Sequence, residues 1–251
     1  MTKALPWRTA WVTGASTGIG RDIVLQLAAA GVKVAASARS PDKLHALGPD
    51  VLAVPLDVTD AAACHAAVEH IERELGPIDL VVMGAGTYSP VAIDELEPAR
   101  FAHMMGTNYM GVVNCLGALA PGMLARQSGH LSWIASVAGY IGLPKAAAYG
   151  PTKAALINLA ESLYPEMKAR GVKISVINPG FVETPLTAQN DFPMPFLMKP
   201  EEAARRTIEG LAAGRFEIAY PRRFVAILKS LRLLPYSLFF RLIARAVLKP
   251  K

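Results

Sequence analysis

Short apolar runs alternate with longer segments of helical period along this chain of 251 residues, and this alternation constrains its fold more than any other feature. The pattern is typical of successive β-α units. Most runs are apolar throughout, as expected of strands that a parallel sheet buries on both faces. The predicted strands are 10–13, 32–38, 51–55, 78–83, 130–135, 173–178 and 216–219. The chain is therefore predicted to be an α/β protein with a doubly wound, mostly parallel sheet of seven strands in a three-layer fold.

Helical segments separate these strands and cover residues 18–30, 60–75, 98–126, 149–170 and 200–213. Glycine follows four of these helices where a C-cap is expected, at Gly31, Gly76, Gly171 and Gly214. Neither a repeat nor a Ser/Gly linker divides the body of the chain. We therefore predict one domain over residues 1–220 and a basic, amphipathic helical tail over residues 221–251.

The formal net charge of +6 is concentrated at one end of the chain. Residues 218–251 contain eight Lys or Arg and no Asp or Glu, so residues 1–217 keep 18 basic and 20 acidic side chains. A nucleic-acid-binding domain needs a basic face to neutralise phosphates, whereas this body is slightly acidic. The charge distribution therefore argues against a nucleic acid as partner.

The two cysteines, Cys64 and Cys115, form no C-x-x-C pair and lie in apolar helical segments. This predicts buried free thiols and a reducing, cytoplasmic environment. The five histidines show no metal-binding spacing, so no metal is predicted. Residues 1–7 show no pattern of a secretory signal.

A glycine-rich segment follows the first predicted strand directly and opens the first helix. Its sequence is Thr13-Gly14-Ala15-Ser16-Thr17-Gly18-Ile19-Gly20. Glycine at these positions lets the backbone approach a pyrophosphate, and free N–H groups at the helix N-terminus attract its negative charge. The placement favours a Rossmann-like dinucleotide site over an ordinary turn.

The end of the second predicted strand indicates which dinucleotide is bound. NAD-dependent enzymes usually have an acidic residue here that holds the ribose hydroxyls. This strand instead ends Ala36-Ser37-Ala38-Arg39-Ser40. The Arg39 guanidinium can pair with a 2′-phosphate, and Lys43 is a second candidate for that contact. NADP(H) is therefore preferred, while NAD(H) stays open, as does a role for Arg39 as a solvated loop charge.

Tyr149 and Lys153 lie four residues apart in a predicted helix, which places both on one face. A tyrosine with its ordinary pKa of about 10 is a poor base at neutral pH, and the nearby ammonium is expected to favour the phenolate. Pro151 is tolerated in a first turn, so the helix is expected to start near Tyr149. Ser136 follows the fifth predicted strand, at the edge where open α/β sheets hold their sites, and its hydroxyl can orient a substrate oxygen.

Together these motifs resemble the short-chain dehydrogenase/reductase family, whose typical residues recur here in order over about 200 positions. The resemblance implies hydride transfer between a nicotinamide and an alcohol or carbonyl carbon. It implies a catalytic tetrad of Asn108, Ser136, Tyr149 and Lys153, in which Asn108 holds a water that links the lysine to solvent. The residues predicted to bind the cofactor are Gly14, Ser16, Thr17, Gly18, Ile19, Gly20, Arg39, Asp57, Val58, Ala85, Gly86, Tyr149, Lys153, Pro179, Gly180, Val182 and Thr184.

Two family positions carry specific expectations. Asp57 would bond the adenine, with a role near a helix N-cap as the alternative, and Val182 and Thr184 would meet the nicotinamide carboxamide. After the fourth strand the family usually has N-A-G, whereas this chain has Gly84 before Ala85 and Gly86. In the family this asparagine steadies the sheet, so its absence puts local rigidity in doubt more than chemistry.

Almost no charged residue occupies the positions where the family builds its substrate walls. These positions hold Tyr88, Val137, Tyr140, Ile141, Leu143, Phe181, Leu186, Phe192, Met194, Phe196 and Met198. A charged sugar or amino acid would find few partners among such side chains. The predicted substrate is therefore an apolar carbonyl or alcohol, such as a lipid, a steroid-like molecule or a long-chain ketone.

Apolar clusters alternate with Arg and Lys at roughly helical spacing over residues 222–249, and Pro235 divides this tail. Its longest charge-free run, residues 233–240, is far shorter than the roughly 20 residues of a spanning helix. Two interpretations stay open. The tail lies in a membrane interface as a basic amphipathic helix does, or it packs on the body or a neighbouring subunit with its arginine stems over apolar surface.

The predicted function is that of an NADP(H)-dependent alcohol dehydrogenase or carbonyl reductase. The alternatives are a nucleotide-sensing or scaffold protein that binds the cofactor without turnover and, on the tail alone, a peripheral membrane adaptor. By resemblance, we expect a homodimer or homotetramer that pairs through helices 98–126 and 149–170. The expected location is the cytoplasm, with peripheral contact at the inner face of a membrane.

Overall fold

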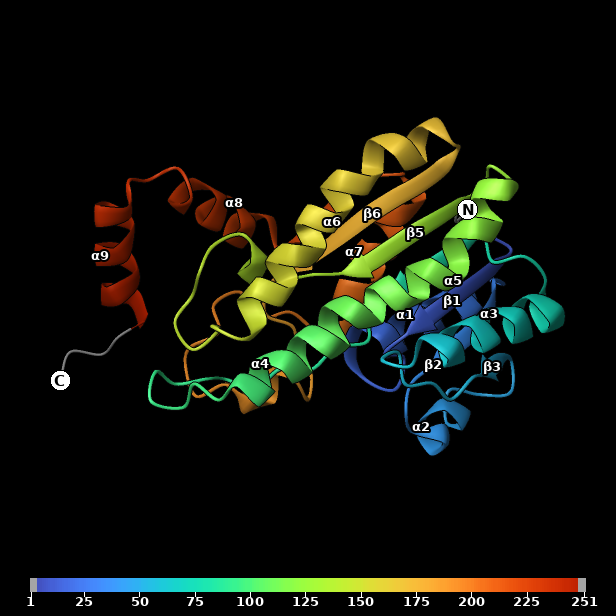
Figure 1. Cartoon of the computed structure of the whole chain (residues 1–251), viewed down its shortest axis with the longest axis horizontal. Coiled ribbons are helices and arrows are strands. Elements are labelled where there is room, and N and C mark those ends of the chain that lie inside the picture. Colours follow the sequence, from blue (N-terminus) through green and yellow to red (C-terminus); the bar gives the residue numbers. More distant parts are fainter. Residues whose placement is uncertain (1–3, 248–251) are drawn as a thin grey trace.

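The computed structural model describes residues 4–247, which contain one parallel sheet of seven strands in the order β3-β2-β1-β4-β5-β6-β7 (Figure 1). The strands are β1 (Thr9–Thr13), β2 (Lys33–Ser37), β3 (Val51–Ala53), β4 (Leu80–Met83), β5 (Gly129–Ile134), β6 (Val172–Pro179) and β7 (Glu217–Tyr220). The first and last residues of each strand differ by at most two positions from those of the predicted apolar run. The α/β class and the seven-stranded parallel sheet are therefore confirmed.

Helices cover both faces of the sheet, with α5 and α6 in front of it and α1 and α7 behind it in Figure 1. The helices are α1 (Gly18–Ala29), α2 (Pro41–His45), α3 (Ala61–Leu75), α4 (Pro98–Met105), α5 (Gly111–Ala125), α6 (Tyr149–Ala169), α7 (Pro200–Ala212), α8 (Arg222–Leu231) and α9 (Tyr236–Val247). All five predicted helical regions are present. The short helix α2 was not predicted, because five residues are too few to show a helical period.

Successive side chains of each central strand enter two separate cores. Trp11 of β1 packs into the core shared with α3, α5 and α6, whereas Ala10 and Val12 pack into the core shared with α1 and α7. All three side chains are fully buried. Because both faces exclude water, every position of such a strand must be apolar, which is why the runs are continuous.

The four glycines predicted to end helices all adopt a positive φ, between +65° at Gly214 and +90° at Gly76. Glycine adopts this region without the steric penalty that a side chain would bring. Pro151 is the third residue of α6, so the prediction that this helix starts at Tyr149 is confirmed as well.

One predicted helix, 98–126, is interrupted. A π-helical turn at Gly106–Met110 separates α4 from α5, and its central residue, Asn108, is fully buried. The sequence pattern misses this turn because one π turn hardly changes the spacing of apolar residues. Such turns often occur at functional sites.

Cys64 on α3 and Cys115 on α5 are free and buried, as predicted. Although 51 positions separate them in the sequence, their Sγ atoms lie 3.9 Å apart. The two helices therefore pack closely at this point.

The C-terminal segment consists of two helices that Pro235 separates, as predicted. Phe224, Val225 and Leu228 of α8 pack in a cluster with Val137 and Tyr140 of the body. The predicted division of the chain at residue 220 stays a prediction. Among residues 4–247, no helix has the length and apolar character that crossing a membrane requires.

Gly84, where the family has asparagine, lies at the end of β4 against β1. Its N–H donates to the Thr13 carbonyl oxygen at 3.1 Å and to Thr13 Oγ1 at 3.2 Å, and the Ala85 N–H donates to the same hydroxyl at 3.3 Å. Thr13 thus holds this segment in the absence of an asparagine side chain. A Cβ atom at position 84 would lie 2.9 Å from the Thr13 carbonyl oxygen and 3.0 Å from Ile134 Cδ1.

Restoring the family residue with Gly84→Asn is therefore expected to destabilise the protein, by about 1–3 kcal/mol for an overpacked site. Gly117→Ala is the control, because nothing lies within 4 Å of a Cβ atom at this exposed position of α5. The control is expected to gain about 0.5–1 kcal/mol from the better helix propensity of alanine. Thermal unfolding measures both changes, and a higher Tm for Gly84→Asn would contradict the tight packing described here.

Candidate active site

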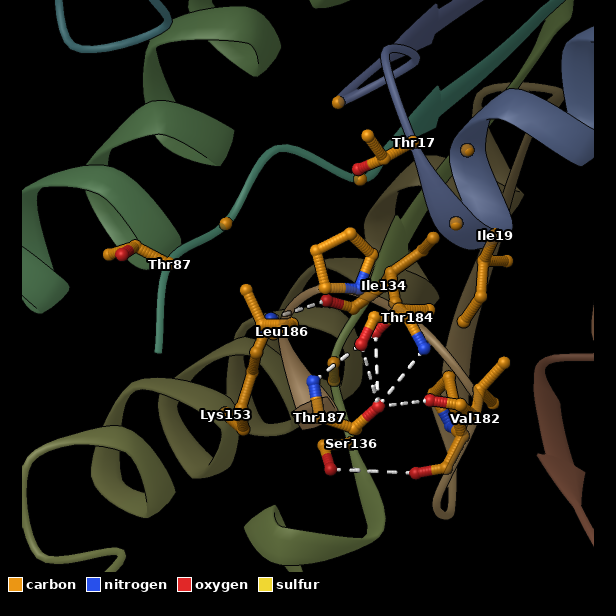
Figure 2. Close-up of a pocket in the computed structure, with 18 of the residues that line it drawn as sticks. Thr17, Ile19, Thr87, Ile134, Ser136, Lys153, Val182, Thr184, Leu186 and Thr187 are labelled. Carbon is orange, nitrogen blue, oxygen red and sulfur yellow. Dashed lines mark hydrogen bonds between the residues drawn. The ribbon is translucent and has the colours of Figure 1, made fainter. Parts of the chain in front are cut away.

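A cavity of about 330 Å³ lies at the edge where β1, β4, β5 and β6 end. The carboxyl ends of parallel strands meet at one edge, so the loops that follow them converge there. The lining residues are Gly14, Ser16, Thr17, Gly18, Ile19, Gly20, Gly84, Gly86, Thr87, Ile134, Ala135, Ser136, Tyr149, Lys153, Pro179, Gly180, Val182, Thr184, Pro185, Leu186, Thr187 and Gln189. Figure 2 shows that they come from segments far apart in the sequence.

The glycine turn between β1 and α1 forms one wall of this cavity. Gly14 has a φ of +70°, and a Cβ atom there would lie 2.5 Å from the carbonyl carbon of Gly84. Thr17 precedes α1 without a side-chain cap, and the first turn holds no acidic residue. The N–H groups of this turn are therefore available to a phosphate, with the positive end of the helix dipole behind them. The turn fits the pyrophosphate of a dinucleotide.

Asp57 and Arg39 lie at the next strand ends. Asp57 Oδ1 accepts hydrogen bonds from the Thr59 N–H at 2.9 Å and the Thr59 hydroxyl at 2.8 Å. These bonds, aided by the charge of Arg39, hold the pKa of the Asp57 carboxyl below its ordinary value. The α3 N-cap is Asp60 rather than Asp57. Of the residues predicted to bind the cofactor, four lie outside the cavity: Arg39, Asp57, Val58 and Ala85.

Tyr149 and Lys153 share the cavity-facing side of the first turns of α6. The Lys153 Nζ atom lies 5.5 Å from the centre of the Tyr149 ring and donates a hydrogen bond of 2.8 Å to the Ile134 carbonyl oxygen at the end of β5. Lys153 is 95% buried. Such burial is unusual for a lysine unless its ammonium has partners. The expected pairing of the two side chains is present.

The protonation states differ from the expectation that Lys153 lowers the pKa of Tyr149. Burial raises the pKa of Tyr149 to about 12, and a hydrogen bond with Ser136 only partly offsets this effect. Burial also lowers the pKa of Lys153 to about 8. Desolvation disfavours the charged form of both groups and is the largest cause of both shifts. At neutral pH the site therefore holds a neutral phenol beside an ammonium.

Ser136 and Asn108 complete the predicted tetrad in different ways. Ser136 lines the cavity, and its hydroxyl donates to the Pro179 carbonyl oxygen at 3.4 Å (Figure 2). Asn108 Oδ1 accepts from the Thr87 N–H at 2.7 Å, and its amide donates to the Thr87 carbonyl oxygen and the Thr152 hydroxyl. Asn108 thus fixes the loop after β4 against α6 from behind the cavity wall.

The segment after β6 forms the wall opposite α6. Pro179, Gly180, Val182 and Thr184 line the cavity, as do Pro185, Thr187 and Gln189 of the same segment. Together with Thr87, Ile134 and Ala135 elsewhere in the lining, the last three are residues that the sequence did not single out. Thr187 Oγ1 donates to the Val182 carbonyl oxygen at 2.5 Å and accepts from the Thr184 N–H at 3.0 Å. Figure 2 shows this network between the start of α1 and Ser136. A Thr in a proline-rich loop carries no sequence signal for such a role.

The predicted substrate residues fall into groups. Leu186 lines the cavity, and the Tyr88 ring meets the Tyr149 ring edge-on at 5.1 Å. Phe181 lies against Phe192 at 6.0 Å and stacks on Phe224 of α8 at 5.5 Å. Three other predicted residues lie near α8. The Phe196 ring is 6.0 Å from the Phe224 ring. Val137 and Ile141 pack in the cluster that contains Phe224, Val225 and Leu228. Of the eleven predicted residues, Leu186 alone lines the cavity, and the other ten lie outside it.

Tyr140 has a different environment from the predicted one. Its hydroxyl donates to Glu217 Oε1 at 2.6 Å, and Asn178 Nδ2 donates to the same oxygen at 3.2 Å. Lys229 of α8 pairs with Glu217 Oε2. Burial raises the pKa of Glu217, but these three donors outweigh burial and hold the pKa below its ordinary value. Glu217 therefore ties the loop after Ser136 to α8, a role that one acidic residue in a short strand does not reveal.

Comparisons with known proteins agree with this geometry. The sequence model of the family described as short chain dehydrogenase matches residues 8–193. An uncharacterised oxidoreductase of Myxococcus xanthus is 38% identical over 242 residues, which cover 94% of this chain and 96% of the relative. A 3-oxoacyl-[acyl-carrier-protein] reductase of Escherichia coli is 35% identical over 184 residues, which cover 72% of this chain and 75% of the relative.

The fold has close counterparts among solved structures. A short chain dehydrogenase from Burkholderia cenocepacia, crystallised in complex with NADP, matches with a TM-score of 0.84 at 24% identity. The match covers 97% of this chain and 98% of that one. The likeness includes the C-terminal region and concerns the fold alone.

Proposed function

The chain belongs to the short-chain dehydrogenase family of oxidoreductases, and from this premise we propose that it is an NADP(H)-dependent carbonyl reductase or alcohol dehydrogenase. The observation that carries the proposal is the pair formed by the Tyr149 phenol and the Lys153 ammonium. Both side chains face a cavity that the glycine turn also lines. A proton donor thus lies beside a site that fits a dinucleotide.

The proposed mechanism follows from these protonation states. The bound cofactor would supply or accept the hydride at the reacting carbon. Ser136 orients the substrate oxygen, and Tyr149, which is neutral at pH 7, donates its proton to that oxygen during reduction. The phenolate that would remain is stabilised by the positive charge of the buried Lys153. In the oxidation of an alcohol the proton moves in the opposite direction.

An apolar carbonyl or alcohol is the proposed substrate. Lys153 is the one charged side chain among the residues that line the cavity, and Tyr88, Leu186 and Phe181 add apolar surface nearby. A 3-oxoacyl thioester belongs to this class, and relatives that are 35% identical are named as reductases of such compounds. A series of ketones and 3-oxoacyl thioesters of increasing chain length would identify the substrate, with preference for long apolar chains expected.

The remaining parts of the proposal concern assembly and location. We propose a homodimer or homotetramer that pairs through α4, α5 and α6 in the cytoplasm, with peripheral contact to a membrane. The second candidate function is a nucleotide-binding protein without turnover. The complete set of Ser136, Tyr149 and Lys153 around one cavity favours catalysis.

Tyr149→Phe separates catalysis from mere nucleotide binding. Removal of the proton donor is expected to lower kcat for NADPH-dependent reduction by about 10²- to 10⁴-fold, while NADPH binding, measured by calorimetry, stays unchanged. Tyr164→Phe is the matched control, since Tyr164 lies on the same helix but packs against Phe216. Unchanged turnover in Tyr149→Phe, or NADPH binding by the native protein without reduction of any carbonyl compound, would refute the proposal.

Arg39→Ala tests the choice of cofactor. Loss of a charge-assisted bond to the 2′-phosphate is expected to weaken NADPH binding by roughly 10- to 100-fold and to leave NADH binding unchanged. Lys33→Ala, at the opposite end of β2, removes the same charge far from the site and is expected to affect neither. Equal losses for NADPH and NADH in Arg39→Ala would show that Arg39 does not select the cofactor.

A further inference from the structure

The two C-terminal helices differ in what covers their apolar side chains. On α8, Phe224, Val225 and Leu228 are buried, and they pack in the cluster that contains Val137 and Tyr140. The apolar face of α8 thus serves the body of the protein. Of the two interpretations of the tail, packing on the body describes α8.

The second helix buries Phe239, but the described part of the chain leaves several of its other apolar side chains exposed. Leu233 is 85% exposed, Tyr236 77% and Phe240 61%, and the rings of the last two stack at 5.7 Å. We define the α9 apolar surface as Leu233, which precedes the helix, and two exposed rows on the helix. Tyr236 and Phe240 form one row, and Leu238 and Leu242 form the other, about 120–160° around the helix from the first. Scattered exposed apolar residues are ordinary, but two exposed rows on one short helix, one of them with stacked rings, mark an interaction surface.

Only positive charges accompany this surface. Residues 222–247 contain six Arg or Lys and no Asp or Glu, and within the part of the chain that the structure describes, Lys229 alone of the six pairs with a carboxylate. Arg241 and Arg245 lie one turn apart on α9, about 100° around the helix from Phe240 at their nearest. The charges therefore border the apolar side chains.

Charge and shape together indicate the partner. In α9 the apolar side chains spread over a wide arc, and Arg241 and Arg245 occupy the remaining side of the helix. Such an amphipathic helix suits the surface of an anionic bilayer. With 12 residues, α9 is about 18 Å long, enough to lie in the interface. Another highly exposed apolar residue, Ile93, is followed by Asp94, Glu95 and Glu97 and does not fit such a surface.

The position of α8 connects this surface to the active site. Lys229 pairs with Glu217, which also holds Tyr140 in the loop after Ser136, and Phe224 stacks on Phe181. In Figure 1, α8, α9 and the beginning of α6 lie at the same end of the molecule, toward which β5 and β6 run. A partner that binds α9 would therefore lie on the same side of the protein as the cavity.

We propose that α9, carried on α8, docks this protein on an anionic lipid bilayer, from which the apolar carbonyl substrate enters the active site. The docking rests on α9 alone, whereas the delivery of substrate rests on the proposed reductase function. Docking through α9 shortens the path of a poorly soluble substrate, because the substrate then need not cross water between the bilayer and the cavity.

Flotation of the full-length protein with lipid vesicles tests the docking. We expect the protein to float with vesicles of phosphatidylcholine and phosphatidylglycerol, and to float far less with phosphatidylcholine alone or at high salt. Arg241→Gln with Arg245→Gln is expected to weaken binding roughly 30-fold. Tyr236→Ser with Phe240→Ser should weaken it by about tenfold or more. Ile93→Ser, an equally exposed site outside the α9 apolar surface, should have no effect.

Activity with two forms of substrate tests the delivery. With a long-chain ketone held in anionic vesicles, Tyr236→Ser with Phe240→Ser is expected to reduce the NADPH oxidation rate in parallel with the loss of vesicle binding. With a short, water-soluble ketone the same variant should match the native protein, which also shows that it is folded. Absence of reduction with any ketone would refute the reductase function and leave the flotation result to decide the docking.

Three outcomes would overturn the docking. The first is a native protein that stays at the bottom of the gradient with anionic vesicles. The second is binding that the Tyr236 and Phe240 substitutions leave unchanged. The third is a change from a larger to a smaller oligomer in those variants, by sedimentation, without vesicle binding by the native protein, which would assign the α9 apolar surface to a second copy of the chain.

Discussion

The burial of the Lys153 ammonium beside the Tyr149 phenol is the constraint on which the rest of the site depends. An ammonium out of water needs partners, and it finds them in the Ile134 carbonyl oxygen at 2.8 Å and the face of the tyrosine ring. Both partners are within reach because the first turns of α6 pack beside the end of β5. The glycine turn and the segment after β6 then close the cavity around this pair, so the sheet positions its chemistry through the ends of its strands.

Much of this arrangement follows from the sequence, for reasons that individual residues make clear. Trp11 and its neighbours are apolar because both faces of β1 are covered, and Pro151 is tolerated because it stands in the first turn of α6. The π turn at Asn108 and the role of Glu217 could not be predicted, since each depends on contacts between distant segments. The pKa of Tyr149 was expected to fall toward the phenolate, whereas burial raises it. A spacing motif shows that two groups are neighbours but not how much water surrounds them.

The C-terminal helices show the same limit. Basic and apolar residues alternate over both helices, and that pattern is compatible with packing on protein and with contact to lipid. The structure distinguishes the two helices, because Phe224 and Leu228 of α8 are buried, whereas α9 buries Phe239 and leaves Tyr236 and Phe240 exposed. Through Glu217, α8 also joins the loop that follows Ser136. Helix α8, which the sequence places in the C-terminal tail, thus supports the active site through these contacts.

The central claim is that a neutral Tyr149 and a protonated Lys153 form the working state of this site, and the pH dependence of kcat tests it most directly. For NADPH-dependent reduction of a soluble ketone, we predict a kcat that is level near neutral pH and falls as the pH rises through about 8, where Lys153 loses its proton. Tyr149 keeps its proton throughout this range, since its pKa is about 12. A kcat that rises as the pH increases above neutral would mean that the reaction requires the phenolate, and would contradict this account.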